Sequence, residues 1–184
     1  MALKQIASFV FLAASGCHGW QTATLTVPTQ SVGVIVNSET KVTLGTAFVV
    51  RTFGRQARIV TCAHVAQQGK FDYRPQNIER SYPLSHIISL QSQDLSIFQV
   101  ADGVTLEGTG WEGFGFGEGK RLGTGDTVLY LGYKTDQDSI KGAASKIIAT
   151  GEGVTVFGGI GDFIEFEGIA KPGFSGGACF QPAR

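Results

Sequence analysis

Residues 172–177 read P-G-F-S-G-G, so that a single serine, Ser175, stands among three glycines. Glycine adopts backbone dihedrals that other residues avoid, and the stretch therefore predicts a tight turn that presents the serine hydroxyl. In such a turn, backbone N–H groups can converge on a carbonyl oxygen that gains negative charge. We expect Gly173 and Ser175 to donate those N–H groups, with Ser175 as a nucleophile.

Two other segments supply the groups that a serine nucleophile needs. A serine hydroxyl is a weak nucleophile at neutral pH unless an imidazole accepts its proton, and His64 ends the strand-like segment I-V-T-C-A-H. The imidazole needs an acceptor on its other nitrogen, and Asp94 opens the strand-like segment D-L-S-I-F-Q-V. His64, Asp94 and Ser175 are therefore the candidate catalytic residues. Taken singly, each also has a structural explanation, as a buried histidine, a strand cap and a turn serine.

The composition is that of a folded domain with no dominant charge. Of the 184 residues 42% are apolar and 16% are charged, and the 15 basic residues equal the 15 acidic ones. Such a chain can bury a core, and no net field draws it to phosphate groups. We therefore expect no nucleic-acid partner, and the sequence implies no metal or organic cofactor.

Short β-type runs separated by glycine, asparagine or aspartate predict an all-β fold built as a sandwich or a barrel. One helical turn is expected, at residues 63–67. The glycine-rich stretch from residue 101 to residue 126 is interpreted as a connection between two β subdomains. The predicted strands cover residues 32–36, 43–50, 58–62, 87–91, 95–100, 127–133, 144–150, 154–157 and 163–167.

The three motifs, in the chain order His, Asp, Ser, resemble the trypsin-like serine proteases of the chymotrypsin fold, in the bacterial style of the HtrA/Deg proteases. The small-residue segment G-T-A-F at 45–48 adds to this resemblance. The resemblance implies two six-stranded antiparallel barrels, with the first at about 28–102, a linker at about 103–126 and the second at about 127–184.

The same resemblance implies a serine endopeptidase that cleaves peptide or protein substrates through an acyl-enzyme. Two alternatives stay open. One is a protease-like module that binds peptides or proteins without cleaving them, and the other is a surface lipoprotein whose β domain serves structure or adhesion.

The sequence departs from the family at two places. Phe174 stands where trypsin-like enzymes carry the aspartate that pairs with a newly cut amino terminus, so activation by that ion pair is not expected. The sequence ends at Arg184, soon after the nucleophile. We therefore expect the second barrel to be incomplete, with most of the specificity pocket outside this sequence.

The first residues have the layout of a secretory signal peptide, expected over residues 1–19 and followed by a peptidase domain over 20–184. Lys4 precedes an apolar run at 6–14 that ends in small residues. A short buried helix is the alternative. Because L-A-A-S-G-C resembles a lipobox, lipidation at Cys17 is a further alternative to ordinary cleavage. We expect an exported, periplasmic or secreted protein, attached to a membrane only if it is lipidated; its oligomeric state is left open.

Cys62 and Cys179 belong to the mature domain on either reading of the amino terminus. An oxidising compartment permits a disulfide between them, and two separate buried thiols are the alternative.

Overall fold

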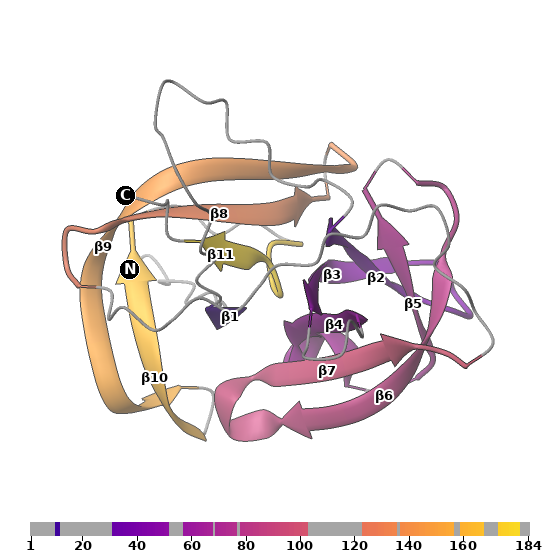
Figure 1. Ribbon diagram of the computed structural model, residues 1–184, viewed down its shortest axis with the longest axis horizontal. Helices are drawn as coiled ribbons and strands as arrows, with labels where there is room; N and C mark the ends of the chain where they lie inside the picture. The colour runs from indigo at the N-terminus through magenta and orange to yellow at the C-terminus, as the bar shows by residue number, and fades with distance from the viewer. Residues whose placement is uncertain are drawn as a thin grey trace, which may run out of the picture.

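The computed structural model describes residues 10–11, 31–51, 57–67, 69–76, 78–102, 123–135, 137–156, 159–167 and 173–180. Within them the chain forms two β units side by side, which confirms the all-β prediction (Figure 1). Two short 3-10 helices, η2 (Ala63–Ala66) and η3 (Gln91–Gln93), lie between strands. The strands are β1 (Val10–Phe11), β2 (Val32–Asn37), β3 (Thr43–Arg51), β4 (Ala57–Cys62), β5 (Phe71–Pro75), β6 (Tyr82–Leu90), β7 (Leu95–Val100), β8 (Thr127–Lys134), β9 (Ser139–Val156), β10 (Gly159–Phe166) and β11 (Ala178–Phe180).

The first unit is a closed antiparallel barrel with the strand order β2-β3-β4-β7-β6-β5. Successive side chains of a strand point to opposite faces, so alternate residues of the strands fill the barrel interior. Burial of one such large apolar side chain stabilises the fold by about 1.5–3 kcal/mol. The interior includes Ile35, Val49, Ile59, Tyr73 and Phe98, each no more than 2% exposed.

Strand β5 was missed by the sequence analysis, because its sequence F-D-Y-R-P contains residue types that strands disfavour. In the structure it pairs with β2, and Phe71 and Tyr73 are buried. Asp72 is 7% exposed, and its carboxylate accepts a hydrogen bond of 2.7 Å from the Ser38 hydroxyl. Tertiary pairing and this hydrogen bond therefore override the local propensity. β6 also begins earlier than predicted, at Tyr82.

The second unit is a five-stranded sheet with the order β1-β11-β8-β9-β10. It forms a partial sheet, as expected for an incomplete second barrel. The two predicted strands at 144–150 and 154–157 are wrong as separate elements, since β9 runs through both as one strand. Glycines near residue 151 suggested a break, but the ladder with β10 continues there, with Gly151 opposite Phe163.

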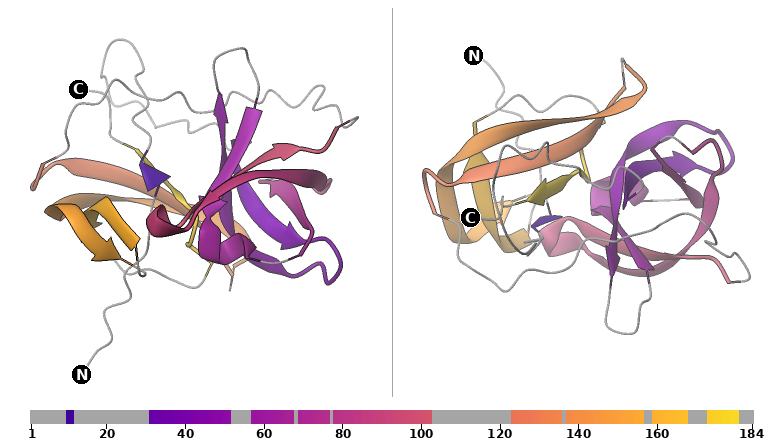
Figure 2. Two further views of the ribbon diagram at one scale, coloured as in Figure 1. Left: turned by 90° about the horizontal axis from the view of Figure 1, so that it is seen from below. Right: turned by 45° about the horizontal axis from the view of Figure 1, so that its top comes forward.

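Apolar side chains join the two units, which lie side by side in the two further views of Figure 2. Val32, Phe48 and Val60 on the outside of the barrel form a buried cluster with Ala178 of β11. Val34 and Val36 pack with Tyr133 of β8. β2 is thus buried on both of its faces, which explains its nearly continuous apolar sequence.

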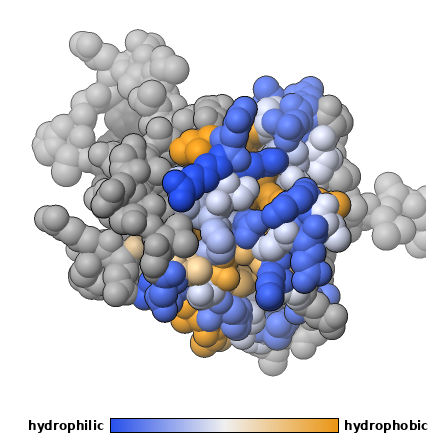
Figure 3. Space-filling view, turned by 90° about the vertical axis from the view of Figure 1, so that its right-hand side faces the viewer, coloured by the Kyte–Doolittle hydropathy of each residue, from blue (hydrophilic) through white to orange (hydrophobic). Residues whose placement is uncertain are grey.

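Parts of the predicted organisation lie outside the described residues. These are most of the linker and, apart from Val10 and Phe11, the signal-peptide segment. The backbone of these two residues pairs in parallel with β11. No helix among the described residues is long and apolar enough to cross a bilayer. On the barrel side of the molecule, the described surface is largely hydrophilic with scattered apolar residues (Figure 3).

Candidate active site

His64 and Asp94 are brought together by the ladder between β4 and β7. Cys62, the last residue of β4, pairs with Leu95, the first residue of β7. His64 lies in η2, directly after β4, and Asp94 directly precedes β7. The Ala63 N–H donates to the backbone carbonyl of Asp94 over 2.9 Å, which fixes the two segments against each other. Asp94 itself adopts a left-handed conformation, with φ of 50°, which aspartate tolerates better than most residues.

His64 makes two hydrogen bonds to the Asp94 carboxylate, one through its ring and one through its backbone. His64 Nδ1 lies 2.6 Å from Asp94 Oδ2, and the His64 backbone N–H donates to Oδ1 over 2.9 Å. The His64 side chain is 40% exposed, whereas that of Asp94 is only 8% exposed. The structure thus joins the predicted imidazole and its predicted acceptor, with the imidazole open to solvent.

The environment of Asp94 favours its charged form. Burial by itself raises the pKa of the carboxyl, but the hydrogen bonds and charge of His64 outweigh it, and the pKa lies below its ordinary value of 3.8. Asp94 is therefore a carboxylate at neutral pH. A carboxylate hydrogen-bonded to Nδ1 holds the proton on that nitrogen and leaves Nε2 as the basic atom.

Ser175 lies in a turn whose two glycines need unusual backbone dihedrals. Gly173 has φ of 92° and Gly176 has φ of 81°, a region that side-chain-bearing residues rarely adopt. A backbone hydrogen bond of 2.9 Å from the Gly177 N–H to the Phe174 carbonyl closes the turn. The predicted tight turn is therefore present, with Gly173 and Ser175 in it.

The turn rests on the first barrel, close to the segment that carries His64. The Ser175 carbonyl accepts a hydrogen bond of 2.8 Å from the backbone N–H of Thr46 on β3. A Cβ atom at Gly45 would lie 2.9 Å from that carbonyl oxygen and 2.9 Å from a methyl group of Val65, the residue after His64. The missing side chain at Gly45 therefore lets the turn and the histidine segment approach each other.

Gly176 has an equally close contact with the barrel. A Cβ atom there would lie 2.2 Å from the Thr46 carbonyl oxygen and 2.3 Å from the Thr61 hydroxyl. No side chain fits at this distance, so glycine is required by contact as well as by φ. The bare backbone of Gly176 therefore leaves room for β3 and β4.

Thr46 is a residue whose part in the site the sequence analysis missed. It is fully buried on β3. Its hydroxyl donates to the Gly173 carbonyl over 2.7 Å and accepts a hydrogen bond of 2.7 Å from the Tyr133 N–H. The Thr46 backbone N–H also bonds the Ser175 carbonyl. Thr46 thus links the glycine turn to β3 and β8. The signal in the sequence was a hydroxyl residue in the otherwise apolar segment G-T-A-F.

Phe174 packs in the position where the family resemblance placed an aspartate. It is 6% exposed, and its ring lies against Gly132, where a Cβ atom would be 2.6 Å from Cγ. Its ring centroid is 6.1 Å from that of Tyr130. Phe174 is therefore held by apolar packing against β8, whereas the aspartate implied by the family resemblance would be held by an ion pair.

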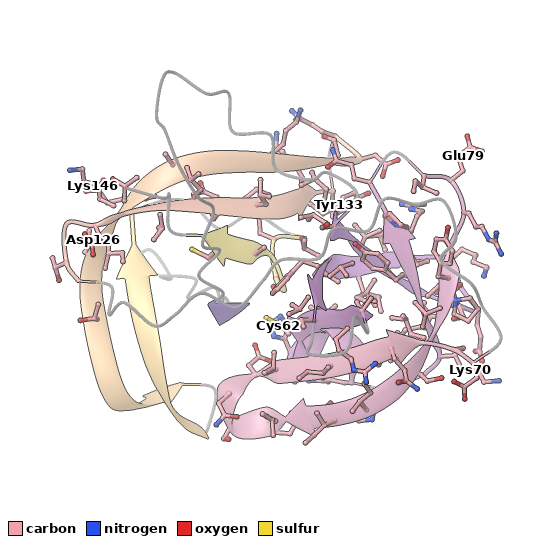
Figure 4. The ribbon with its side chains drawn as sticks, in the orientation of Figure 1. Cys62, Lys70, Glu79, Asp126, Tyr133 and Lys146 are labelled. Carbon is pink, nitrogen blue, oxygen red and sulfur yellow. The ribbon has the colours of Figure 1, made fainter. Side chains whose placement is uncertain are left out.

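Cys62 contributes a thiol beside the histidine and aspartate, and Figure 4 shows its side chain next to the η2 turn. The residue is fully buried. Burial and the charge of Asp94 raise the pKa of the Cys62 thiol well above its ordinary range, so the thiol is protonated at neutral pH. Cys62 and Cys179 are both buried and form no disulfide in the structure, which favours the alternative of two separate buried thiols.

Comparisons with known proteins agree with the observed fold and also identify a family. Residues 45–184 match the trypsin-like peptidase domain family. No curated protein sequence matches the chain.

Solved structures of bacterial proteases have a similar fold. The HtrA-type protease AlgW with a bound decapeptide has a TM-score of 0.65 and 18% identity, over 83% of this chain and 53% of AlgW. A serine endoprotease from Yersinia pestis has a TM-score of 0.65 and 20% identity, over 83% of this chain and 50% of that one. An inactive form of Rv3671c from M. tuberculosis H37Rv has a TM-score of 0.62 and 19% identity, over 94% and 80% of the two chains.

The chain spans about half the length of the AlgW and Yersinia chains. At these identities the likeness shows the chymotrypsin-like fold, while the family match covers most of the chain. The protein therefore belongs to the trypsin-like peptidase domain family.

Proposed function

We propose that the protein is a serine endopeptidase in which Ser175 is the nucleophile, His64 the general base and Asp94 the residue that orients His64. The observation that carries this proposal is the double hydrogen bond between His64 and the buried Asp94 carboxylate. A nearby turn with two glycines at positive φ presents Ser175, and its backbone contacts β3 beside Val65.

In the proposed reaction, the Ser175 hydroxyl oxygen attacks the carbonyl carbon of a peptide bond while His64 Nε2 accepts the hydroxyl proton. The Asp94 carboxylate stabilises the imidazolium that forms. His64 then gives the proton to the leaving amine, which leaves an acyl-enzyme on Ser175. Water hydrolyses this ester with His64 again as the base.

The proposed oxyanion donors are the backbone N–H groups of Gly173 and Ser175. Negative charge develops on the substrate carbonyl oxygen, and donors fixed in advance stabilise it most when they need no reorganisation. Thr46 supports this role, because it bonds the Gly173 and Ser175 carbonyls and so anchors the turn at the peptide unit that follows each proposed donor. Packing of Phe174 against β8 also stabilises the turn. It does so without an ion pair to a newly cut amino terminus.

The proposed substrates are peptides or proteins. This part of the proposal draws on the family match and on the peptide held by AlgW. We further propose export by a signal peptide over residues 1–19, with a peptidase domain over 20–184.

A non-catalytic peptide-binding module is the second candidate function. The partial second sheet favours it, because the described strands of this unit that follow the proposed signal peptide form an open sheet with the ends β11 and β10. Such a module keeps the His64–Asp94 pair but lacks an activated serine.

A fluorophosphonate probe distinguishes the two functions, since it labels only an activated serine. We expect the wild-type chain to be labelled and Ser175→Ala to be unlabelled. His86→Ala is the matched control, because His86 is an exposed histidine bonded to Ser89 and lies outside the proposed site. Absence of labelling in the folded wild-type protein would support the binding module instead.

A further inference from the structure

Cys62, His64 and Asp94 form a cluster of three metal-ligating groups at the base of the candidate site. Each offers one ligand atom, and the three atoms lie within 4.8 Å of one another. Thiolate, imidazole and carboxylate are all ligands of Zn²⁺ in proteins. The pairing of Cys62 with Leu95 fixes the two segments before any ion binds, so binding needs little ordering of the chain.

We propose that this cluster is an inhibitory site for a soft divalent cation, Zn²⁺, bound by Cys62, His64 and Asp94. The ion has no part in the peptidase reaction described above. The inhibition rests on the proposed function, whereas the metal site itself does not.

The three ligand atoms lie within 4.8 Å of one another and reach tetrahedral zinc geometry after shifts of about 1 Å. Zinc lies about 2.3 Å from sulfur and about 2.0–2.2 Å from nitrogen or oxygen, so its ligand atoms are roughly 3.3–3.7 Å apart. His64 Nδ1 and Asp94 Oδ2 are 2.6 Å apart, and they must separate by only about 1 Å to admit the ion. The 40% exposure of the His64 side chain gives the ion a route from solvent, and water completes the fourth position.

Neighbouring N–H donors already contact the Cys62 sulfur and the Asp94 carboxylate. The backbone N–H of Gly176 hydrogen-bonds the Cys62 sulfur, and the backbone N–H of His64 donates to Asp94 Oδ1. Such outer contacts hold ligand atoms in place and favour metal binding. Cys62 also hydrogen-bonds the Asp94 side chain, so its sulfur already lies at the carboxylate.

The proposed binding step balances in charge and protons. Zn²⁺ displaces the thiol proton of Cys62, which passes to solvent, and the resulting thiolate and the Asp94 carboxylate neutralise the ion. The Nδ1 proton of His64 is replaced by the metal, and the neutral imidazole then carries its proton on Nε2. In that state Nε2 cannot accept a proton from Ser175, which accounts for the inhibition.

Cobalt(II) is the direct probe of the site, because a cobalt–thiolate bond produces an intense near-ultraviolet charge-transfer absorption. We expect Co²⁺ added to the full chain to produce this band at one equivalent, and Zn²⁺ to abolish it. Cys62→Ala should lose the band and weaken Zn²⁺ binding by more than about 100-fold, since removal of a ligand exceeds the loss caused by removal of an outer contact. Cys179→Ala removes the other fully buried thiol and should keep the band.

The spectrum is also recorded on Ser175→Ala, which tests the metal site independently of peptidase activity. In the active protein, Zn²⁺ should inhibit turnover of a peptide ester, a chelator should restore it, and Cys62→Ala should lose the sensitivity. A Co²⁺ spectrum without a thiolate band, or one that Cys62→Ala leaves unchanged, overturns the site. A normal spectrum without inhibition overturns only the regulatory role, and an unlabelled, inactive wild type overturns the peptidase proposal instead.

Discussion

In the first barrel, His64 and Asp94 are held by the register of one ladder, whereas the turn with Ser175 is held by contacts that cross between the two β units. The pairing of Cys62 with Leu95 places the histidine and the aspartate within one closed sheet. The Ser175 turn depends on Thr46 of β3, on the bare backbone of Gly45 and on the close approach of Gly176 to β4. The His64–Asp94 pair is thus local to one unit, and the position of the proposed nucleophile, Ser175, depends on how the two units pack.

Asp94→Asn tests the part of the site within the first barrel and should have the largest effect on turnover. The neutral amide favours the wrong imidazole tautomer, which lowers kcat by about 10⁴-fold in other triads. Steady-state hydrolysis of a peptide ester measures the effect. Because the Ser175 turn makes its contacts elsewhere, a thermal unfolding curve should still show one cooperative transition. Activity within about threefold of wild type would reject the assignment of Asp94.

Gly173→Val tests the part of the site carried by the turn. The position has φ of 92°, and a Cβ atom would lie 2.7 Å from the Tyr133 carbonyl oxygen. We expect kcat to fall by about 10²–10³-fold, the loss that follows removal of one oxyanion donor, and crowding adds to it. The His64–Asp94 hydrogen bond should persist, visible as an unchanged low-field imidazole proton resonance. Near-normal turnover would contradict the role of Gly173.

Thr46→Val and Thr46→Ser together test the connection between the two units. Valine keeps the shape but removes the hydrogen bonds to Gly173 and Tyr133, which contribute about 1 kcal/mol each and leave buried groups unpaired. We expect Thr46→Val to lower kcat about 10–100-fold with a smaller change in KM, and Thr46→Ser to restore most of kcat. Equal losses in both variants, in proportion to lost stability, would mean that Thr46 only supports the fold.

The pH dependence of stability gives the smallest expected effect and again concerns the first barrel. The pKa of Asp94 is lower in the folded protein than its ordinary value of 3.8. Its contribution to stability is therefore fully present above about pH 3.8 and is lost as the pH falls through the folded value. Urea unfolding of wild type and Asp94→Asn should differ most at neutral pH and less below that range. A gap that stays constant in acid would argue against a stabilised carboxylate.

The sequence predicted the strands best where residue type and burial agree. β2, β3, β4 and β7 were found because β-branched and apolar residues follow one another there. β5 was missed, since its Asp72 and Pro75 disfavour a strand and only pairing with β2 compensates. The break assigned within β9 was wrong for the converse reason, because the local glycines are accommodated by a register shift opposite Gly161 and Phe163 and do not end the ladder with β10.

For the candidate site, too, residue type predicted some residues, and only tertiary contacts revealed the others. His64, Asp94, Gly173 and Ser175 were chosen from residue type and order along the chain, and the structure joins His64 to Asp94 and places Gly173 and Ser175 in one turn. Thr46 and the thiol of Cys62 were not assigned to the site. A threonine on a strand and a buried cysteine are common, and only their contacts distinguish these two.

The sequence by itself determined the chemistry that this protein can offer: a serine in a glycine turn, an imidazole and a carboxylate, in an order similar to that of the trypsin-like family. Those features depend on side-chain type and on backbone freedom, which are local properties. Only the tertiary structure decided that β4 and β7 align Cys62, His64 and Asp94, and that Thr46 holds the turn from another strand. These contacts join residues far apart in the chain, and their formation depends on strand register and on the packing of the two units, which no short segment encodes.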